Sequence, residues 1–150
     1  MTGDIVSDLK RDEGWSPHIY QDHLGYWTIG IGFLVDVRRG GGLPLPVAEH
    51  WLAYLLDKIE ADLDARIPWW RQQPDDVRRA LLNLAYQLGV SGLLNFKRML
   101  AALRVGDRAG AAREALDSTW ATQTPARASR VSALMRGALK RPPRCRGGQC

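Results

Sequence analysis

Hydrophobic and polar positions divide the chain into a short mixed N-terminal part and a longer helical part. Apolar residues recur at helical spacing over residues 3–12, and Gly14 favours an end to that helix. Residues 17–35 are rich in β-branched and aromatic side chains and predict a β-hairpin or small meander, with its turn between Asp22 and Gly25. Three glycines and two prolines predict a loop over residues 38–46.

From residue 46 onward the apolar spacing is helical. A long helix is predicted over 46–66 and ends before Pro68, with an apolar stripe made of Trp51, Leu52, Leu55, Leu56, Ile59 and Leu63. Further helices are predicted over 74–88, 92–104, 107–117 and 126–139. A small antiparallel β-element followed by helices indicates an α+β protein that is mostly helical.

Composition narrows the class of partner but does not fix it. The net charge is +5, and it is uneven: residues 1–75 carry 7 Lys and Arg against 12 Asp and Glu, whereas residues 76–150 carry 14 against 4. A basic surface attracts polyanions, which include nucleic acids and the acidic polymers of membranes and cell walls. The cysteines, Cys145 and Cys150, cannot form a disulfide framework, and no Cys and His cluster has metal-site spacing, so no cofactor is expected.

The N-terminal residues predict a chain that is made in the cytoplasm. The first fourteen residues are rich in charge and have no apolar stretch of the kind that a signal peptide needs. No window approaches the roughly 18 apolar residues of a membrane span. We therefore expect that a target outside the membrane would be reached only after another factor releases the protein.

Three polar residues of the N-terminal part are candidates for glycoside hydrolysis. Glu13 ends the first predicted helix, Asp22 lies in the predicted turn, and Thr28 lies in the strand that follows. Such hydrolysis commonly needs one protonated and one ionised carboxyl group, held in different environments. An apolar or aromatic surrounding is expected to keep the acid at the helix end protonated by desolvation, and the second carboxyl group, on a turn open to water, is expected to be ionised. A hydroxyl such as that of Thr28 can hold a water molecule. On spacing alone this reading is weak, since surface charge explains most Glu and Asp residues.

The segment R-D-E-G-W, followed by Y-Q-D-H-L-G-Y-W-T-I-G-I-G-F, closely resembles the catalytic segment of the T-even phage lysozyme family. Glu13, Asp22 and Thr28 fit that family's spacing of Glu, eight residues, Asp, five residues, Thr without a gap. The resemblance continues through residues 80–89 and 118–131 and covers residues 3–139. It implies a lysozyme-like fold of two lobes with a cleft between them, and hydrolysis of the β-1,4 bond between N-acetylmuramic acid and N-acetylglucosamine in peptidoglycan.

The resemblance also assigns roles to residues. Glu13 would be the general acid, and Asp22 and Thr28 would position or activate the attacking water in an inverting mechanism. Gln87 and Trp120 match a cleft-side Gln and the last Trp of the family and are candidate substrate contacts, although a solvated amide explains Gln87 equally well. Tyr26 and Trp27 alternate along a strand, so one is expected to face sugar and the other the lobe interior. Tyr26 is the candidate substrate contact.

The chain also departs from the family pattern at two places. Phe33 stands where many relatives have His, which bears on local packing. Thr119 stands where T-even relatives have Arg before the Trp, which removes one basic contact. Trp51, Trp69 and Trp70 are expected to pack in the core or at the lobe junction rather than against sugar.

The predicted organisation is a lysozyme domain over 1–139, with a small lobe (1–45), a connecting helix (46–67) and a helical lobe (68–139), and a basic flexible tail over 140–150. The leading hypothesis is a monomeric endolysin, held in the host cytoplasm until a holin-type protein releases it to the periplasmic cell wall. The alternative is a peptidoglycan-binding module of a virion or secretion structure with weak turnover. A nucleic-acid-binding protein is disfavoured, because no recognition-helix signature is evident. Transglycosylation in place of hydrolysis stays open.

Overall fold

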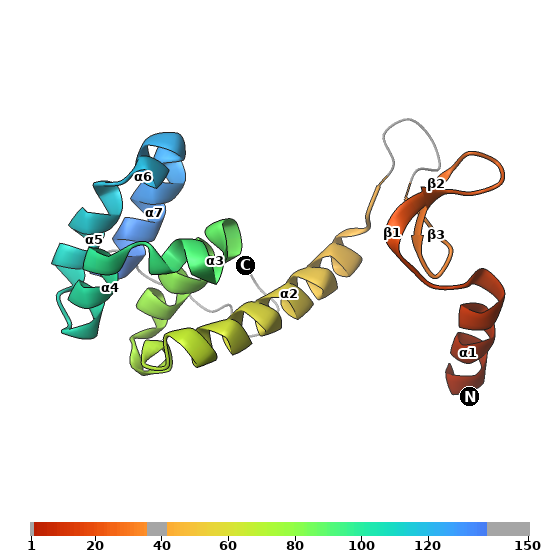
Figure 1. Ribbon diagram of the computed structural model, residues 1–150, viewed down its shortest axis with the longest axis horizontal. Helices are drawn as coiled ribbons and strands as arrows, with labels where there is room; N and C mark the ends of the chain where they lie inside the picture. The colour runs from red at the N-terminus through yellow and green to blue at the C-terminus, as the bar shows by residue number, and fades with distance from the viewer. Residues whose placement is uncertain (1, 36–41, 138–150) are drawn as a thin grey trace, which may run out of the picture. The chain divides into compact units, whose positions relative to one another are not determined.

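The computed structural model describes residues 2–35 and 42–137, and Figure 1 shows their helices and strands along the chain. The chain divides into two compact units, Met1–Leu52 and Ala53–Cys150. One small antiparallel sheet combined with several helices confirms the predicted α+β class. The predicted tail over 140–150 lies outside the described residues.

The first unit contains one helix and a three-stranded antiparallel sheet in the order β1-β2-β3. Its elements are α1 (Thr2–Glu13), β1 (Ser16–Gln21), β2 (Trp27–Gly30) and β3 (Phe33–Leu34). The central strand β2 pairs Thr28 with Tyr20 of β1 and with Leu34 of β3. The predicted hairpin or small meander is therefore a meander, with its first turn at the predicted position.

The long helix α2 (Leu45–Arg66) begins in the first unit and ends in the second. It starts one residue before the predicted position, and Pro46, where the predicted loop and helix meet, lies in its first turn. The N–H groups of Val47 and Ala48 both donate to the carbonyl of Pro44, at 3.0 Å. Proline is tolerated in a first helical turn because its missing N–H would have no helical partner there.

The second unit holds the hydrophobic core of the described residues. Besides the end of α2, its elements are a 3-10 helix η1 (Trp70–Gln72), α3 (Asp75–Leu94), α4 (Lys97–Arg104), α5 (Arg108–Leu116), α6 (Thr119–Gln123) and α7 (Pro125–Arg136). The core gathers apolar side chains from α2 through α7, among them Leu63, Trp70, Leu81, Leu84, Met99, Leu103, Ala112, Val131 and Met135. Burial of this surface is the main driving force for folding the unit.

Two helix boundaries differ from the prediction. Gly89 interrupts α3 with φ 72° and ψ 162°, as expected of a stop, but helix resumes at once and ends at Leu94. The single predicted helix over 92–104 is wrong, because Phe96 leaves helical geometry and its ring packs edge-on against Trp120 at 6.0 Å. Here the contact between Phe96 and Trp120 outweighs the helical spacing of apolar residues along the sequence.

The short helix α6 was not predicted. Trp120 lies between the helices predicted over 107–117 and 126–139, in the first turn of α6. The Ser118 hydroxyl caps this helix by accepting a hydrogen bond from the N–H of Ala121 at 3.2 Å. Ser is a preferred N-cap residue, so the cap was the available indication of this helix.

Arg108 joins three helices of the second unit. Its guanidinium donates to the Asp76 carboxylate of α3, to the carbonyl of Met135 at 2.6 Å and to that of Leu134 at 3.2 Å. The two carbonyls belong to the last turn of α7, where carbonyls have no partner within the helix. Arg108 therefore closes the end of α7 onto the starts of α3 and α5.

Replacing Arg108 tests whether its hydrogen bonds to Asp76, Leu134 and Met135 stabilise the second unit. We expect Arg108→Met to lower the free energy of unfolding by about 2 kcal/mol, because it leaves a half-buried carboxylate and two carbonyls without their donor. Urea unfolding followed by circular dichroism measures the change. Arg104→Met, at an exposed position of α4, is the matched control. Equal losses in the two variants would contradict the role of Arg108.

A second polar network fastens η1 to α2. The Asp64 carboxylate accepts hydrogen bonds from Arg71 and from the indole of the buried Trp70. The hydrogen bond from Arg71 lowers the pKa of Asp64 below its ordinary value, and the one from Trp70 lowers it further. A lowered folded-state pKa means that the network adds stability above the unfolded-state pKa and loses it as the pH falls through the folded-state pKa.

This sign gives a pH-dependent prediction. The difference in unfolding midpoint between the wild type and Asp64→Asn should be constant above about pH 5 and should shrink below about pH 4. Thermal unfolding at a series of pH values measures it. A difference that stays unchanged down to about pH 3 would show that ionisation of Asp64 does not stabilise the fold.

Candidate active site

Glu13 is the last residue of α1, and its position is set by two glycines. Gly14 ends the helix with φ 74°, and its N–H donates to the carbonyl of Lys10 at 3.0 Å. The Glu13 carboxylate lies against Gly32, where an added Cβ would come within 2.6 Å of Oε2. Gly32 also has φ +65°, which side-chain-bearing residues rarely adopt. The turn between β2 and β3 thus leaves room for this carboxylate because position 32 has no side chain.

The environment of Glu13 differs from the prediction. An apolar, aromatic surrounding was expected for the catalytic acid, yet Glu13 is exposed and its neighbour Trp15 is 71% exposed. In the structure, the Glu13 carboxylate lies against the backbone of Gly32, which has no side chain. The sequence pattern did not reveal this contact of Glu13 with Gly32.

Asp22 builds the turn between β1 and β2. Its Oδ1 accepts the N–H groups of Leu24 and Tyr26, both at 2.9 Å, and its carbonyl accepts the N–H of Gly25 at 2.9 Å. Within the part of the chain that the structure describes, Oδ2 accepts no hydrogen bond. The half-buried carboxylate therefore has one oxygen committed to the turn and one available to a ligand or a water molecule.

Thr28 lies in the central strand and is 3% exposed. Its hydroxyl donates to the carbonyl of Tyr26 at 3.2 Å, which leaves the oxygen lone pairs as acceptors. Tyr20 pairs with Thr28, and the N–H of Asp22 donates to the carbonyl of Tyr26. Residues that pair across strands share a face, so Asp22 and Thr28 are diagonal neighbours on one face.

The three predicted catalytic residues therefore surround one strand. Asp22 lies in the turn before β2, Thr28 lies within β2, and Glu13 rests on Gly32 in the turn after β2. All three belong to the first unit. A carboxylate at each end of the strand and a hydroxyl between them is an arrangement suited to acid and base chemistry on one substrate.

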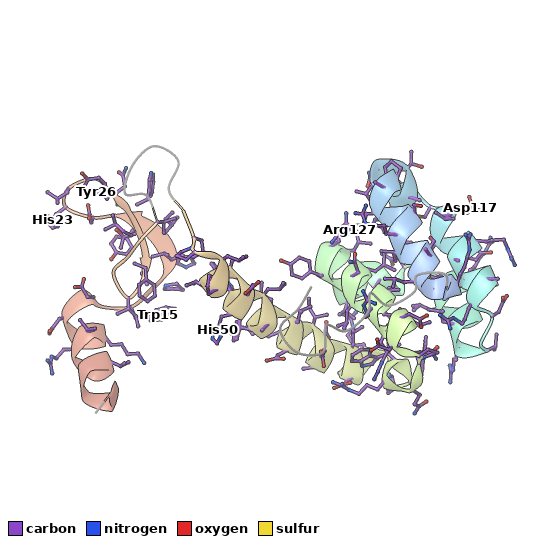
Figure 2. All side chains as sticks on the ribbon, turned by 180° about the vertical axis from the view of Figure 1, so that it is seen from behind. Trp15, His23, Tyr26, His50, Asp117 and Arg127 are labelled. Carbon is purple, nitrogen blue, oxygen red and sulfur yellow. The ribbon has the colours of Figure 1, made fainter. Side chains whose placement is uncertain are left out.

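Tyr26 and Trp27 do not divide between interior and surface as expected. They are 43% and 42% exposed. Neither ring is buried, although Thr28, the next residue of the strand, is. Figure 2 shows Tyr26, with His23, at the turn end of the β1–β2 hairpin. Both aromatic rings of this strand are thus available to a ligand.

The structure brings Gln87 and Trp120 together in the second unit. The indole Nε1 of Trp120 donates to Oε1 of Gln87 at 2.8 Å. Trp120 is 5% exposed, so little of its ring is left for contact with a sugar. The bond uses the carbonyl oxygen of the Gln87 amide and turns its NH₂ group toward other partners. Trp120 thus holds the Gln87 side chain in place through this hydrogen bond. That Gln87 contacts the substrate stays a prediction.

Arg127 and Arg130, three residues apart on α7, have different environments. Its Nε donates to Oδ1 of Asn83 at 2.8 Å, and the side chain is half-buried, whereas Arg130 is exposed. Asn83 and Gln87 are four residues apart on α3 and so share a face. Figure 2 shows Arg127 on α7. The two amides of α3 are therefore held by α7 and α6, respectively.

Next to Trp120 lies a cavity of about 730 Å³ within the second unit. Leu88, Phe96 and Met99 contribute apolar surface, and four charged side chains line it as well: Lys97, Arg98, Glu114 and Asp117. Figure 2 shows Asp117 on this unit.

The described residues hold no group of three or more His, Cys, Asp or Glu side chains placed to bind a metal ion. None of the helices described is long and apolar enough to cross a membrane.

Comparison with known proteins places the chain in a family. The family model for phage lysozyme matches residues 10–140. The chain is 33% identical to the pre-baseplate central spike protein Gp5 of Enterobacteria phage T4, over 85% of this chain but 26% of that protein. It is 29% identical to a probable T4-type lysozyme of Dictyostelium discoideum over 90% of this chain and 95% of that protein.

An endolysin of Acyrthosiphon pisum secondary endosymbiont phage 1 is 30% identical over 71% of this chain and 70% of that protein. The chain thus spans about a quarter of the spike protein and nearly all of the Dictyostelium lysozyme. A family match over almost the whole chain agrees with the resemblance carried by Glu13, Asp22 and Thr28. The chain belongs to the phage lysozyme family.

Proposed function

We propose that the protein is a muramidase that hydrolyses the β-1,4 bond between N-acetylmuramic acid and N-acetylglucosamine in peptidoglycan. The observation that carries this proposal is the placement of Glu13, Asp22 and Thr28 around β2. Membership of the phage lysozyme family supports the substrate class. Tyr26, at the turn end of the hairpin, and Gln87, held by Trp120, are the proposed substrate contacts.

The proposed mechanism gives each of the three residues one role. Glu13, in its protonated form, donates its proton to the glycosidic oxygen as the bond to the sugar carbon breaks. A water molecule attacks that carbon from the opposite face. Oδ2 of Asp22 takes the proton of this water, since Oδ1 already accepts two backbone N–H groups. The product has the inverted configuration.

Thr28 orients the same water molecule. Its proton is donated to the carbonyl of Tyr26, so its oxygen can only accept a hydrogen bond from the water. The water then gives one hydrogen to Thr28 and the other to Asp22, which directs an oxygen lone pair at the sugar carbon. This division of roles favours hydrolysis over a transglycosylation that uses no water.

In its biological role, we propose that the protein acts as an endolysin. It would act on the periplasmic cell wall as a monomer after a holin-type protein releases it from the host cytoplasm. The relative named an endolysin supports this role. Similarity to the spike protein Gp5 favours the alternative, a peptidoglycan-binding module of a virion. Turnover on cell walls separates the two, because a binding module would sediment with walls without solubilising them.

Removal of the general acid is the direct test of the proposal. Glu13→Gln should lower the initial rate of cell-wall solubilisation by about 10²- to 10⁴-fold, because the amide cannot donate the required proton. Glu49→Gln, an exposed residue of α2 in the same unit, is the control and should keep full activity. Analysis of the products by mass spectrometry separates hydrolysis from anhydro-sugar formation. A fully active Glu13→Gln variant would overturn the proposal.

The contact with Gly32 gives an independent test. Gly32→Ala would push a methyl group into the Glu13 carboxylate and should abolish most activity. Gly106→Ala has similar backbone strain, with φ +81°, but an added Cβ there meets nothing within 4 Å. Both variants should lose roughly 1 kcal/mol of stability. Similar activity in the two variants, assayed well below their unfolding midpoints, would show that Gly32 does not position Glu13.

A further inference from the structure

Trp15 has the most exposed aromatic side chain of the described residues, at 71%. Its indole forms no hydrogen bond and no ring contact within residues 2–35 and 42–137. A single exposed apolar side chain is common on protein surfaces, so exposure alone assigns no role to Trp15. Its position two residues after Glu13, the proposed general acid, is what gives the exposure meaning.

The backbone on both sides of Trp15 is fixed. Gly14 ends α1 with φ 74°, and its N–H closes the last turn of that helix with a hydrogen bond of 3.0 Å. Ser16 begins β1 and pairs with Gly30, the last residue of β2. Because two residues of chain span at most about 7 Å, the Cα atoms of Glu13 and Trp15 lie within that distance of each other. The chain therefore holds Trp15 beside the general acid without any contact from the indole itself.

Trp15 and Tyr26 lie at opposite ends of β2. Tyr26 belongs to the turn before the strand, where its N–H donates to Asp22 at 2.9 Å. Trp15 precedes the residue that pairs with Gly30, at the other end of the strand. Figure 2 shows Trp15 where α1 meets the sheet and Tyr26 at the turn end of the hairpin. Each of the two proposed catalytic carboxyl groups, on Glu13 and Asp22, thus has an exposed aromatic residue close to it in the chain.

An exposed indole at this position suits a sugar ring. A pyranose ring has a face of C–H groups with a small positive charge, whereas its hydroxyl groups point outward from the edge. The face of an indole is apolar and carries negative charge from its π electrons, so it attracts the C–H face of the sugar. A glycan strand continues on both sides of the bond that is cleaved. Sugar rings on each side therefore need a contact, and the carboxyl groups of the site cannot supply an apolar one.

We propose that Trp15 stacks on a sugar ring of the peptidoglycan strand, next to the glycosidic bond to which Glu13 donates its proton. This inference rests on the proposed muramidase function and adds a subsite at the opposite end of β2 from Tyr26. Every residue that it uses belongs to the first unit. Stacking removes apolar surface of the indole from water, and it holds the sugar equally in the ground state and the transition state. Trp15 therefore lowers KM and leaves kcat unchanged.

The kinetic test compares the same substitution at two exposed tryptophans of the first unit. Soluble, uncross-linked glycan strands are the substrate, and all variants are assayed well below their unfolding midpoints. Trp15→Leu should raise KM about 3- to 10-fold at unchanged kcat, because leucine has no π face. Trp15→Tyr keeps an aromatic face and should stay within about twofold of the wild-type KM. Trp51→Leu, at a 50% exposed position of α2, is the control and should keep the wild-type KM.

Quenching of tryptophan fluorescence by acrylamide supplies a readout that a merely structural role would not move. Glu13→Gln serves as the background, because it should bind the glycan strands without cleaving them. Adding Trp15→Phe in this background identifies the emission of Trp15 by difference. We expect acrylamide to quench this emission readily in the free protein, and glycan strands to protect it. The measurement also decides the matter if Trp15→Leu fails to fold.

The outcomes separate this inference from the proposed function. If the wild type solubilises cell walls but glycan strands do not protect Trp15, the inference alone is overturned. The same holds if Trp15→Leu matches Trp51→Leu in KM, if it lowers kcat alone, or if Trp15 is not quenched in the free protein. Protection of Trp15 in a protein whose wild type has no turnover would support the subsite and overturn the muramidase function. A raised KM together with protection supports the sugar contact of Trp15.

Discussion

The two hydrogen bonds that Oδ1 of Asp22 accepts from the turn are the constraint on which the candidate site depends. They close the turn between β1 and β2, and the turn sets the register that places Thr28 opposite Tyr20. A slip of one residue would move Thr28 to the other face of the strand. The turn therefore determines which side chains can meet the substrate, before any catalytic step is considered.

The two units reach order by different means. The described residues of the first unit rely on strand pairing, glycine turns and short polar contacts, and its large aromatic side chains Trp15 and Phe33 are exposed. The second unit has a continuous apolar core, closed at the end of α7 by Arg108. The proposed catalytic residues thus occupy the unit with fewer buried contacts, as is common for functional regions of low local stability.

The sequence predicted the α+β class and most helices because apolar periodicity and helix stops are local signals. It failed at Phe96, where the deciding contact is with Trp120, far along the chain. It also missed α6, a helix of five residues that the Ser118 hydroxyl caps. For the site, the spacing of Glu13, Asp22 and Thr28 pointed to candidates. It could not reveal that Gly32 receives the carboxylate or that Trp120 binds Gln87, since both contacts arise only when separate elements pack.

Asp22 also bears on the choice between an enzyme and a binding module. The turn itself needs only a side-chain oxygen that accepts two N–H groups, and Asn supplies that as well as Asp does. A carboxylate has a second acceptor oxygen with negative charge, and the turn leaves that oxygen without a hydrogen bond among the described residues. Binding to a largely neutral glycan gains little from such a charge, whereas taking a proton from water requires it. The chemistry of Asp22 beyond its structural task therefore favours turnover over simple binding.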